Sequence, residues 1–176
     1  VAGLDETFDA AIFIGYHSGA GYDGSPLAHT MNTDNNYMKV NGELASEFVI
    51  NSYLAANYGV PVVFLSGDKM LCETAKKFNK NIETVAVKEG VGGASISINP
   101  ELACELIREG VKNALKHISA CKIDIPEKFE VEVNYKEHNR AKRASYFPGV
   151  TQTGPHTVTY TAGNVNEFSI TRMFIL

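Results

Sequence analysis

Two histidines and a glutamate near the start of the chain are the residues whose types and spacing could do chemistry. His17 directly follows a short apolar run, His29 lies at the far end of a polar loop, and Glu47 falls in a segment of helical pattern. Imidazole and carboxylate groups are ligands of catalytic zinc, which keeps one coordination position open for water. If the loop brings these side chains together, the sequence provides the donor set of a metal site.

Each of these residues also has an ordinary structural interpretation. His17 could be a loop histidine bonded to backbone groups, and the two histidines could flank the loop by coincidence. Glu43, Glu47 and Asn51 follow the i, i+4, i+8 spacing that places side chains on one helix face, and such a face is often only the solvated side of a helix. On the residues alone, both interpretations stay open.

Other polar residues give weaker signals. Residues 66–68 (SGD) end an apolar run and could face the same crevice, but they suit a turn equally well. The segment 91–95 (VGGAS) lacks the wider glycine pattern of a phosphate-binding loop, so it does not indicate a nucleotide site. His117, His138 and His156 are expected to be structural or solvated, His117 because the carboxyl end of a helix favours a cation.

The elements that must position the candidate residues alternate between strands and helices. The predicted strands cover residues 10–16, 61–67, 83–89, 129–135 and 157–163, with a further strand within 91–99. The predicted helices cover residues 44–58, 69–79, 100–117 and 164–175. This order predicts an α/β fold with a mixed, mostly parallel sheet flanked by helices, a later β-rich portion and a carboxyl-terminal helix. Residues 1–176 are expected to form a single α/β unit.

Three of these elements carry more specific expectations. The nearly continuous apolar run 10–16 is typical of a strand buried on both faces. Residues 18–36, rich in Gly, Ser, Asp and Asn, predict a long loop, which in a compact domain is more often functional than idle. Asn99 is a suitable amino-terminal cap for the helix 100–117, whose amphipathic pattern rests on Leu102, Leu106, Ile107, Val111 and Leu115.

Composition excludes some functions. The chain has 176 residues, of which 44% are hydrophobic, enough to bury a core, and its formal net charge of −4 argues against binding nucleic acid. The one basic cluster, residues 136–143, is mixed in sign and is interpreted as a solvated surface segment. No apolar run has the length that a membrane span needs, so no membrane partner is expected.

The three cysteines do not form a disulfide framework. They are odd in number, widely spaced and without a CxxC pair. Cys72 and Cys104 lie beside apolar residues in helical patterns, and we expect both to be buried and reduced. Reduced thiols predict a cytoplasmic location.

The whole chain resembles the M55 family of D-aminopeptidases. The resemblance is carried by GYHS, PLAHTM and NGELASEFVINSYLAANYGVPVVFLSGD, and continues through VAVKEG to YFPGVTQTGPHTVTYTA. It implies a zinc metallopeptidase that releases amino-terminal D-amino acids from short peptides. It also implies two zinc ions per complete subunit and a ring-like homo-oligomer, such as a decamer.

The resemblance assigns roles to the candidate residues. The metal-binding histidine of the GYH motif corresponds to His17, and the catalytic histidine of the AHT motif corresponds to His29. The metal-binding glutamate corresponds to Glu47, because counting back from the YGVPV strand fits without a gap, whereas Glu43 is the nearby competitor. Ser46 stands where the family usually has Gly before this glutamate.

One departure from the family pattern bears on activity. The family's other metal ligands, an Asp-x-Glu pair and a further histidine, precede the position at which this sequence begins, so the sequence resembles the carboxyl-terminal two-thirds of a longer chain. Catalytic zinc usually has three protein ligands, and the sequence as given is expected to be inactive by itself. The alternatives are a non-catalytic α/β module that forms oligomers and a metal-dependent hydrolase of another small amide. Metal content separates the module from the enzymes.

Overall fold

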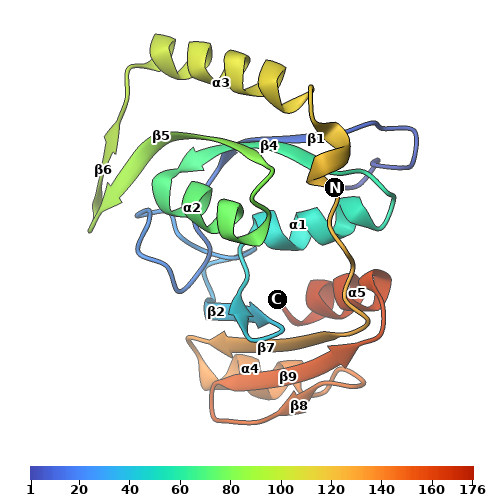
Figure 1. Cartoon of the computed structure of the whole chain (residues 1–176). Coiled ribbons are helices and arrows are strands. Elements are labelled where there is room, and N and C mark those ends of the chain that lie inside the picture. Colours follow the sequence, from blue (N-terminus) through green and yellow to red (C-terminus); the bar gives the residue numbers. More distant parts are fainter. The chain divides into compact units, whose positions relative to one another are not determined.

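The chain folds into two units, each built around its own sheet (Figure 1), and the computed structural model describes all residues, 1–176. Unit 1 comprises Val1–Ser18, Tyr22–Ala28 and Phe48–Asp124. Unit 2 comprises Gly19–Gly21, His29–Glu47 and Ile125–Leu176.

Unit 1 contains the mixed, mostly parallel sheet that the sequence predicts. Its four strands have the order β1-β4-β5-β6, with β4 parallel to β1 and to β5, and with β5 antiparallel to β6. The strands are β1 (Ala11–Tyr16), β4 (Val62–Asp68), β5 (Glu83–Val91) and β6 (Ala94–Ser97). The helices are α1 (Glu47–Ala56), α2 (Lys69–Phe78), α3 (Pro100–Ala114) and the short 3-10 helix η1 (Ile118–Cys121).

Helices cover both faces of this sheet at its central strand β4, in which every residue is buried. On one face, Leu65 belongs to an apolar cluster with Phe48 of α1 and Leu71 of α2. On the other face, Phe64 packs with the side of α3, and Gly110 allows this approach because a Cβ there would lie 2.5 Å from the Phe64 ring. The buried run PVVFLSG therefore forms the core of unit 1.

Strand β1 is not buried on both faces, so that expectation was wrong. Phe13 is buried against α1, but Ile12 and Ile14 on the opposite face are 40% and 54% exposed. The reason is position, because β1 lies at the edge of the sheet and α3 packs over β4 and β5 instead.

Helix α3 is amphipathic and capped by Asn99, whose side chain accepts from the amides of residues 101 and 102. Of its predicted apolar set, Ile107 and Val111 pack against the core. The other three, Leu102, Leu106 and Leu115, are exposed. Cys104 is exposed as well, which contradicts its expected burial, whereas Cys72 is buried, and all three cysteines are free.

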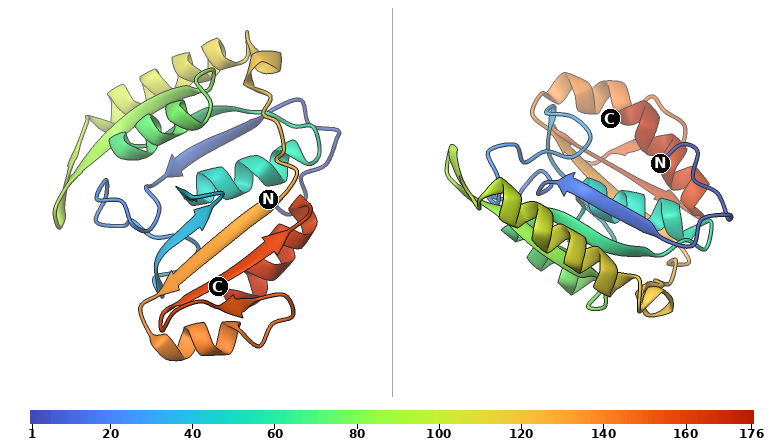
Figure 2. Two further views of the ribbon diagram at one scale, coloured as in Figure 1. Left: turned by 60° about the horizontal axis from the view of Figure 1, so that its bottom comes forward. Right: turned by 90° about the horizontal axis from the view of Figure 1, so that it is seen from above.

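Unit 2 contains the later β-rich portion, an antiparallel sheet of order β3-β2-β7-β9-β8. Its strands are β2 (Asn35–Val40), β3 (Glu43–Leu44), β7 (Phe129–Tyr135), β8 (Thr151–Gln152) and β9 (Thr157–Ala162). Its helices are α4 (His138–Ala144) and α5 (Val165–Ile175), which contact each other and both pack on β9 (Figure 2). Phe129 of β7 stacks on Phe168 of α5 at a centroid distance of 4.8 Å.

One segment of unit 2 has no predicted element. Strand β2 begins at the end of the predicted loop 18–36 and continues to Val40, because these residues pair with the distant strand β7. The basic segment 136–143 is solvated as expected, and it contains most of α4, which packs through two small buried residues, Ala141 and Ala144. Strand β2 and helix α4 both depend on tertiary contacts, which the local residue pattern does not predict.

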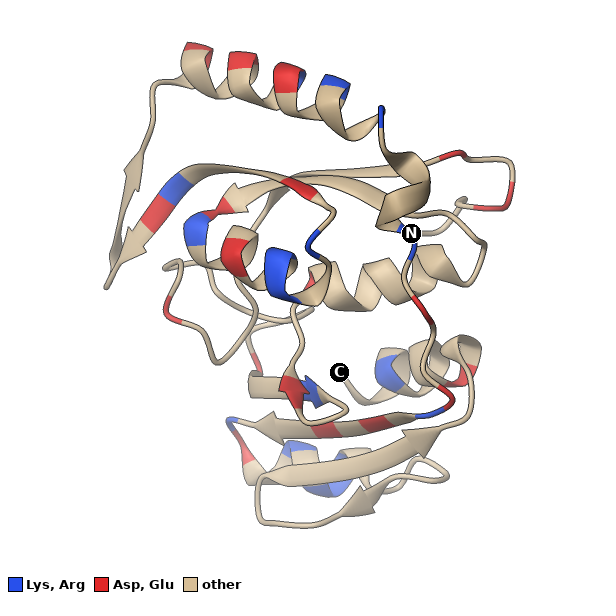
Figure 3. Ribbon diagram, viewed as in Figure 1, with Lys and Arg blue, Asp and Glu red and all other residues tan.

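Residues of both charge signs occur along the ribbon of each unit (Figure 3). None of the helices combines the length and the apolar character needed to cross a bilayer.

Candidate metal centre

His17 is held at the carboxyl end of β1 by its own backbone neighbour. Its Nδ1 lies 2.9 Å from the carbonyl oxygen of Ser18. A carbonyl oxygen only accepts, so in this contact Nδ1 carries the hydrogen. In the neutral imidazole Nε2 is then the unprotonated nitrogen, which is the form that coordinates a metal.

The residue after His17 is fixed by a fully buried carboxylate. Ser18 donates from its amide to Asp68 Oδ2 at 2.6 Å and from its hydroxyl to Oδ1 at 2.5 Å. Asp68 also caps α2 by accepting from the Leu71 amide at 2.8 Å. The same side chain therefore starts a helix and anchors the chain next to His17.

The turn at residues 66–68 has a second structural role. Gly67 lies against the backbone carbonyl of Tyr16, and a Cβ at this position would overlap that oxygen. Ser66 Oγ accepts from the Gly15 amide at 3.2 Å. This segment thus holds the end of β1 in place and is structural rather than part of the donor set.

The polar loop is tied back onto the residues that precede α1. The hydroxyl of Thr30, which is fully buried, accepts from the Ala20 amide and donates to the Ala45 carbonyl, both at 3.0 Å. Gly19 passes so close to Ser46 that a Cβ at position 19 would lie 2.8 Å from the Ser46 Cα. These contacts bring the end of the loop beside the start of the helix.

Glu47 is the first residue of α1 and lies beside His29. Its Oε1 accepts from the Met31 amide at 3.0 Å and is 3.7 Å from His29 Nε2. Met31 has a φ of 66°, a left-handed backbone uncommon for a residue with a side chain. A helix amino terminus favours a carboxylate. The side chains of His29 and Glu47 are 31% and 28% exposed, so both are accessible to a small ligand.

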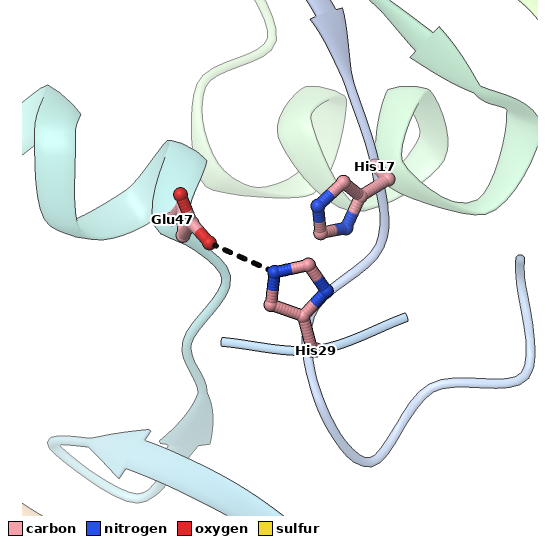
Figure 4. A group of neighbouring side chains, drawn as sticks. All are labelled: His17, His29 and Glu47. Atoms are coloured by element: carbon pink, nitrogen blue, oxygen red, sulfur yellow. Dashed lines mark ion pairs between the residues drawn. The ribbon is translucent and has the colours of Figure 1, made fainter. Parts of the chain in front are cut away.

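The three candidate residues offer ligand atoms that lie within 4.8 Å of one another (Figure 4). Bonds from zinc to imidazole nitrogen or carboxylate oxygen are about 2.0–2.2 Å long, so the ligands of one ion lie at most about 4.4 Å apart. A small side-chain movement would therefore close His17, His29 and Glu47 around an ion. The donor set of two imidazoles and one carboxylate fits zinc.

The predicted helix face of three polar residues is wrong at one position. Glu43 lies in β3, before the helix begins, and is not a member of the group. Asn51 of α1 donates to the hydroxyl of Tyr16 at 3.1 Å. The choice of Glu47 over Glu43 as candidate ligand is consistent with this geometry.

The remaining sequence candidates lie outside the group. The segment 91–95 contains the turn between β5 and β6, at residues 92–93. His117 follows α3 and is exposed. The rings of His138 and His156 are 6.2 Å apart, and His156 Nδ1 contacts the Tyr135 carbonyl. None of them adds a ligand to the centre.

Arg172 is a residue that the sequence analysis missed. It lies in α5 and is only 7% exposed, yet its guanidinium makes no hydrogen bond or ion pair, and its Nε is buried without a partner. Burial lowers the pKa of Arg172, while Tyr160 and Glu47 act in the opposite direction. A cation at a buried position of the helix, between Phe168 and Ile175, is the sequence signal that could have identified it.

Comparison with known proteins gives a consistent picture. The family of D-aminopeptidases designated peptidase M55 matches residues 1–174. The D-aminopeptidase of Bacillus subtilis (strain 168) is 29% identical over 170 residues, which are 95% of this chain and 62% of that protein. The solved structure of the Zn-dependent D-aminopeptidase DppA from Bacillus subtilis, described as a self-compartmentalizing protease, superposes with a TM-score of 0.90 at 27% identity. That match covers 98% of this chain and 64% of the other.

This chain thus spans less than two thirds of the length of either relative. The family pattern nevertheless extends over nearly all of it, and the structural likeness is equally extensive. The chain belongs to peptidase family M55, the D-aminopeptidases.

Proposed function

We propose that this chain forms part of the zinc centre of an aminopeptidase that releases amino-terminal D-amino acids from short peptides. The observation that carries the proposal is the convergence of His17, His29 and Glu47 within 4.8 Å. The zinc dependence and the D-aminopeptidase activity of the similar proteins support the choice of metal and substrate.

His17 and Glu47 are the proposed metal ligands. His17 presents Nε2 because Nδ1 is engaged by the Ser18 carbonyl, and Glu47 is oriented by the Met31 amide. When bound, zinc supplies a Lewis acid for the scissile carbonyl and lowers the pKa of a bound water. We propose two zinc ions per complete subunit, which this part of the site would share with further ligands.

His29 is the proposed catalytic residue. Its Nε2 is 3.7 Å from Glu47 Oε1, and its partial exposure leaves the ring accessible to a bound peptide. An imidazole there can accept a proton from the attacking water and return it to the leaving amine. His29 also belongs to the group of potential ligands, so its role has to be separated experimentally from metal binding.

Zinc affinity, measured by competition with a chromophoric chelator, tests the centre. His17→Ala and Glu47→Gln are expected to weaken zinc binding by at least tenfold, because each removes a ligand. Glu43→Gln is the matched control, since Glu43 is an exposed carboxylate four residues away that lies outside the group. Equal zinc affinity in Glu47→Gln and Glu43→Gln would refute the assignment, and a protein without zinc affinity would favour the non-catalytic module.

Turnover of D-alanyl-D-alanine by the complete protein, which supplies the further metal ligands, separates the two roles of His29. A proton-transfer residue keeps zinc when replaced by alanine but loses roughly 100-fold in rate, whereas a ligand loses zinc as well. Equal hydrolysis of the L,L dipeptide would instead indicate a hydrolase of another small amide.

We further propose that the protein acts as a homo-oligomer, with a ring such as a decamer as its form, because the similar protease is described as self-compartmentalizing. Sedimentation velocity tests this directly, and a monomer at micromolar concentration would contradict it. The three free cysteines are typical of a reducing compartment and support a cytoplasmic location.

A further inference from the structure

The guanidinium of Arg172 is a buried cation without a counter-ion. Arg172 is 7% exposed, and none of the ion pairs of the chain includes it. Its Nε is one of only two buried side-chain polar atoms in the chain that lack a hydrogen-bond partner. Removing a charge from water without pairing it opposes folding, so such groups are normally paired or serve a function.

Arg172 lies near the candidate metal centre within unit 2. The carbonyl oxygen of Leu176, one helical turn beyond Arg172, accepts from Asn32 Nδ2 at 2.9 Å. Asn32 is three residues after His29, in the short segment that also provides the Met31 amide to Glu47. The end of α5 is therefore fastened to the same turn that orients Glu47.

The second unsatisfied buried atom belongs to this turn as well. Asn35 donates from Nδ2 to the Thr30 carbonyl at 2.9 Å and to Asn32 Oδ1 at 3.1 Å, but its Oδ1 has no donor. The chain thus has one buried donor, Arg172 Nε, and one buried acceptor, Asn35 Oδ1, that lack a partner. The charge of Glu47 also acts on Arg172 without forming an ion pair with it.

We propose that Arg172 binds the carboxyl-terminal carboxylate of the short peptide substrate, an inference that rests on the proposed aminopeptidase function. A planar guanidinium with several donors matches a carboxylate in a bidentate manner. In a dipeptide the amino group and the scissile bond belong at the metal centre, and the carboxylate is the one remaining fixed charge. Arg172 then selects for short peptides with a free carboxyl group and is a specificity-determining residue.

The open Asn35 Oδ1 is buried, so it is not assigned a contact with the peptide. A purely structural arginine would be expected to show partners within the protein.

Isothermal titration of the zinc-supplemented protein with D-alanyl-D-alanine and with its carboxyl-terminal amide tests this inference. The wild type should bind the acid about 10- to 100-fold more tightly than the amide, as expected for a hydrogen-bonded charge pair. Arg172→Met should abolish the preference, and Arg172→Lys should retain part of it. Arg143→Met, at an exposed arginine of α4, is the matched control and should behave as wild type.

Thermal unfolding shows whether the variant is folded. Because Arg172→Met replaces an unpaired buried charge by an apolar chain, its Tm should equal or exceed that of the wild type. A structural arginine would give the opposite result.

Three outcomes would overturn the inference. The acid preference could persist in Arg172→Met, it could be missing from the wild type, or the wild type could bind neither peptide. Zinc affinity, measured on the same samples, separates the two proposals. Retained zinc binding would limit the failure to the role of Arg172, whereas loss of zinc affinity together with peptide binding would refute the metal centre as well.

Discussion

Replacing Asp68 by asparagine changes a single atom group in a fully buried side chain that anchors the candidate centre. Asp68 accepts three hydrogen bonds, two from Ser18 and one from the Leu71 amide. Asparagine keeps one carbonyl oxygen but presents an NH2 group in place of the other. This NH2 group then faces either the Ser18 amide or the Leu71 amide, and both of these groups are donors.

The magnitude follows from these contacts. Asparagine caps a helix as well as aspartate does, so the Leu71 bond need not be lost. The lost bond from the Ser18 amide is a bond to a charged acceptor, and it leaves a buried N–H unsatisfied. Together these effects cost about 2–3 kcal/mol. Asp68→Ala also removes the cap and should cost about 1 kcal/mol more.

Urea denaturation measures this loss. With a slope of about 2 kcal/mol/M, Asp68→Asn should lower the unfolding midpoint by about 1–1.5 M at an unchanged slope. Asp124→Asn, at an exposed carboxylate, is the control and should change the free energy of unfolding by less than about 0.5 kcal/mol. A midpoint for Asp68→Asn that coincides with that of the control would refute the anchoring role.

The same substitution links stability to the metal site. The Ser18 carbonyl orients the His17 ring, so a displaced Ser18 should also weaken zinc binding by about tenfold. Unchanged zinc affinity in a destabilised Asp68→Asn protein would show that the anchor serves the fold alone.

Further predictions concern the glycine at the end of β4 and the cysteines. Gly67→Ala should lower the free energy of unfolding, measured in urea, by about 1–3 kcal/mol, because its Cβ would overlap the Tyr16 carbonyl. Gly93→Ala, where a Cβ meets open space, should change the free energy of unfolding by less than about 0.5 kcal/mol. A thiol reagent at neutral pH should modify exposed Cys104 rapidly and buried Cys72 only after unfolding; rapid labelling of both would contradict the burial. Burial raises the pKa of Cys72 to about 11, above the value of about 8.5 for an unfolded thiol. Its contribution to the free energy of unfolding is therefore fully present below about pH 8.5 and is lost as the pH rises toward 11, and Cys72→Ala should flatten that part of the profile in urea titrations.

Local pattern was sufficient for the elements of unit 1. The run PVVFLSG is buried from end to end, Asn99 caps α3, and α2 lies close to its predicted bounds. Each of these depends on hydrophobic spacing and capping within a few residues, which the sequence contains in full. The strict alternation of β7 likewise predicts its one-sided burial.

Other features depend on partners that are distant along the chain. Strand β2 begins in the predicted loop 18–36 and was not predicted, because it forms only through pairing with β7. Ile14 looks buried, but the edge position of β1 leaves it exposed. Glu43 follows helical spacing, yet it lies in β3, where it pairs with Val40 of β2, and α1 begins four residues later.

For the site, the sequence by itself determined the donor types, two imidazoles and a carboxylate, and the resemblance singled out His17, His29 and Glu47. Only the tertiary structure decided that the three converge, because their approach depends on Thr30 and Gly19 tying the loop back onto residues 45–46. It alone also identified Arg172 as a buried cation without a partner, since burial and pairing depend on the surrounding elements and not on residue type.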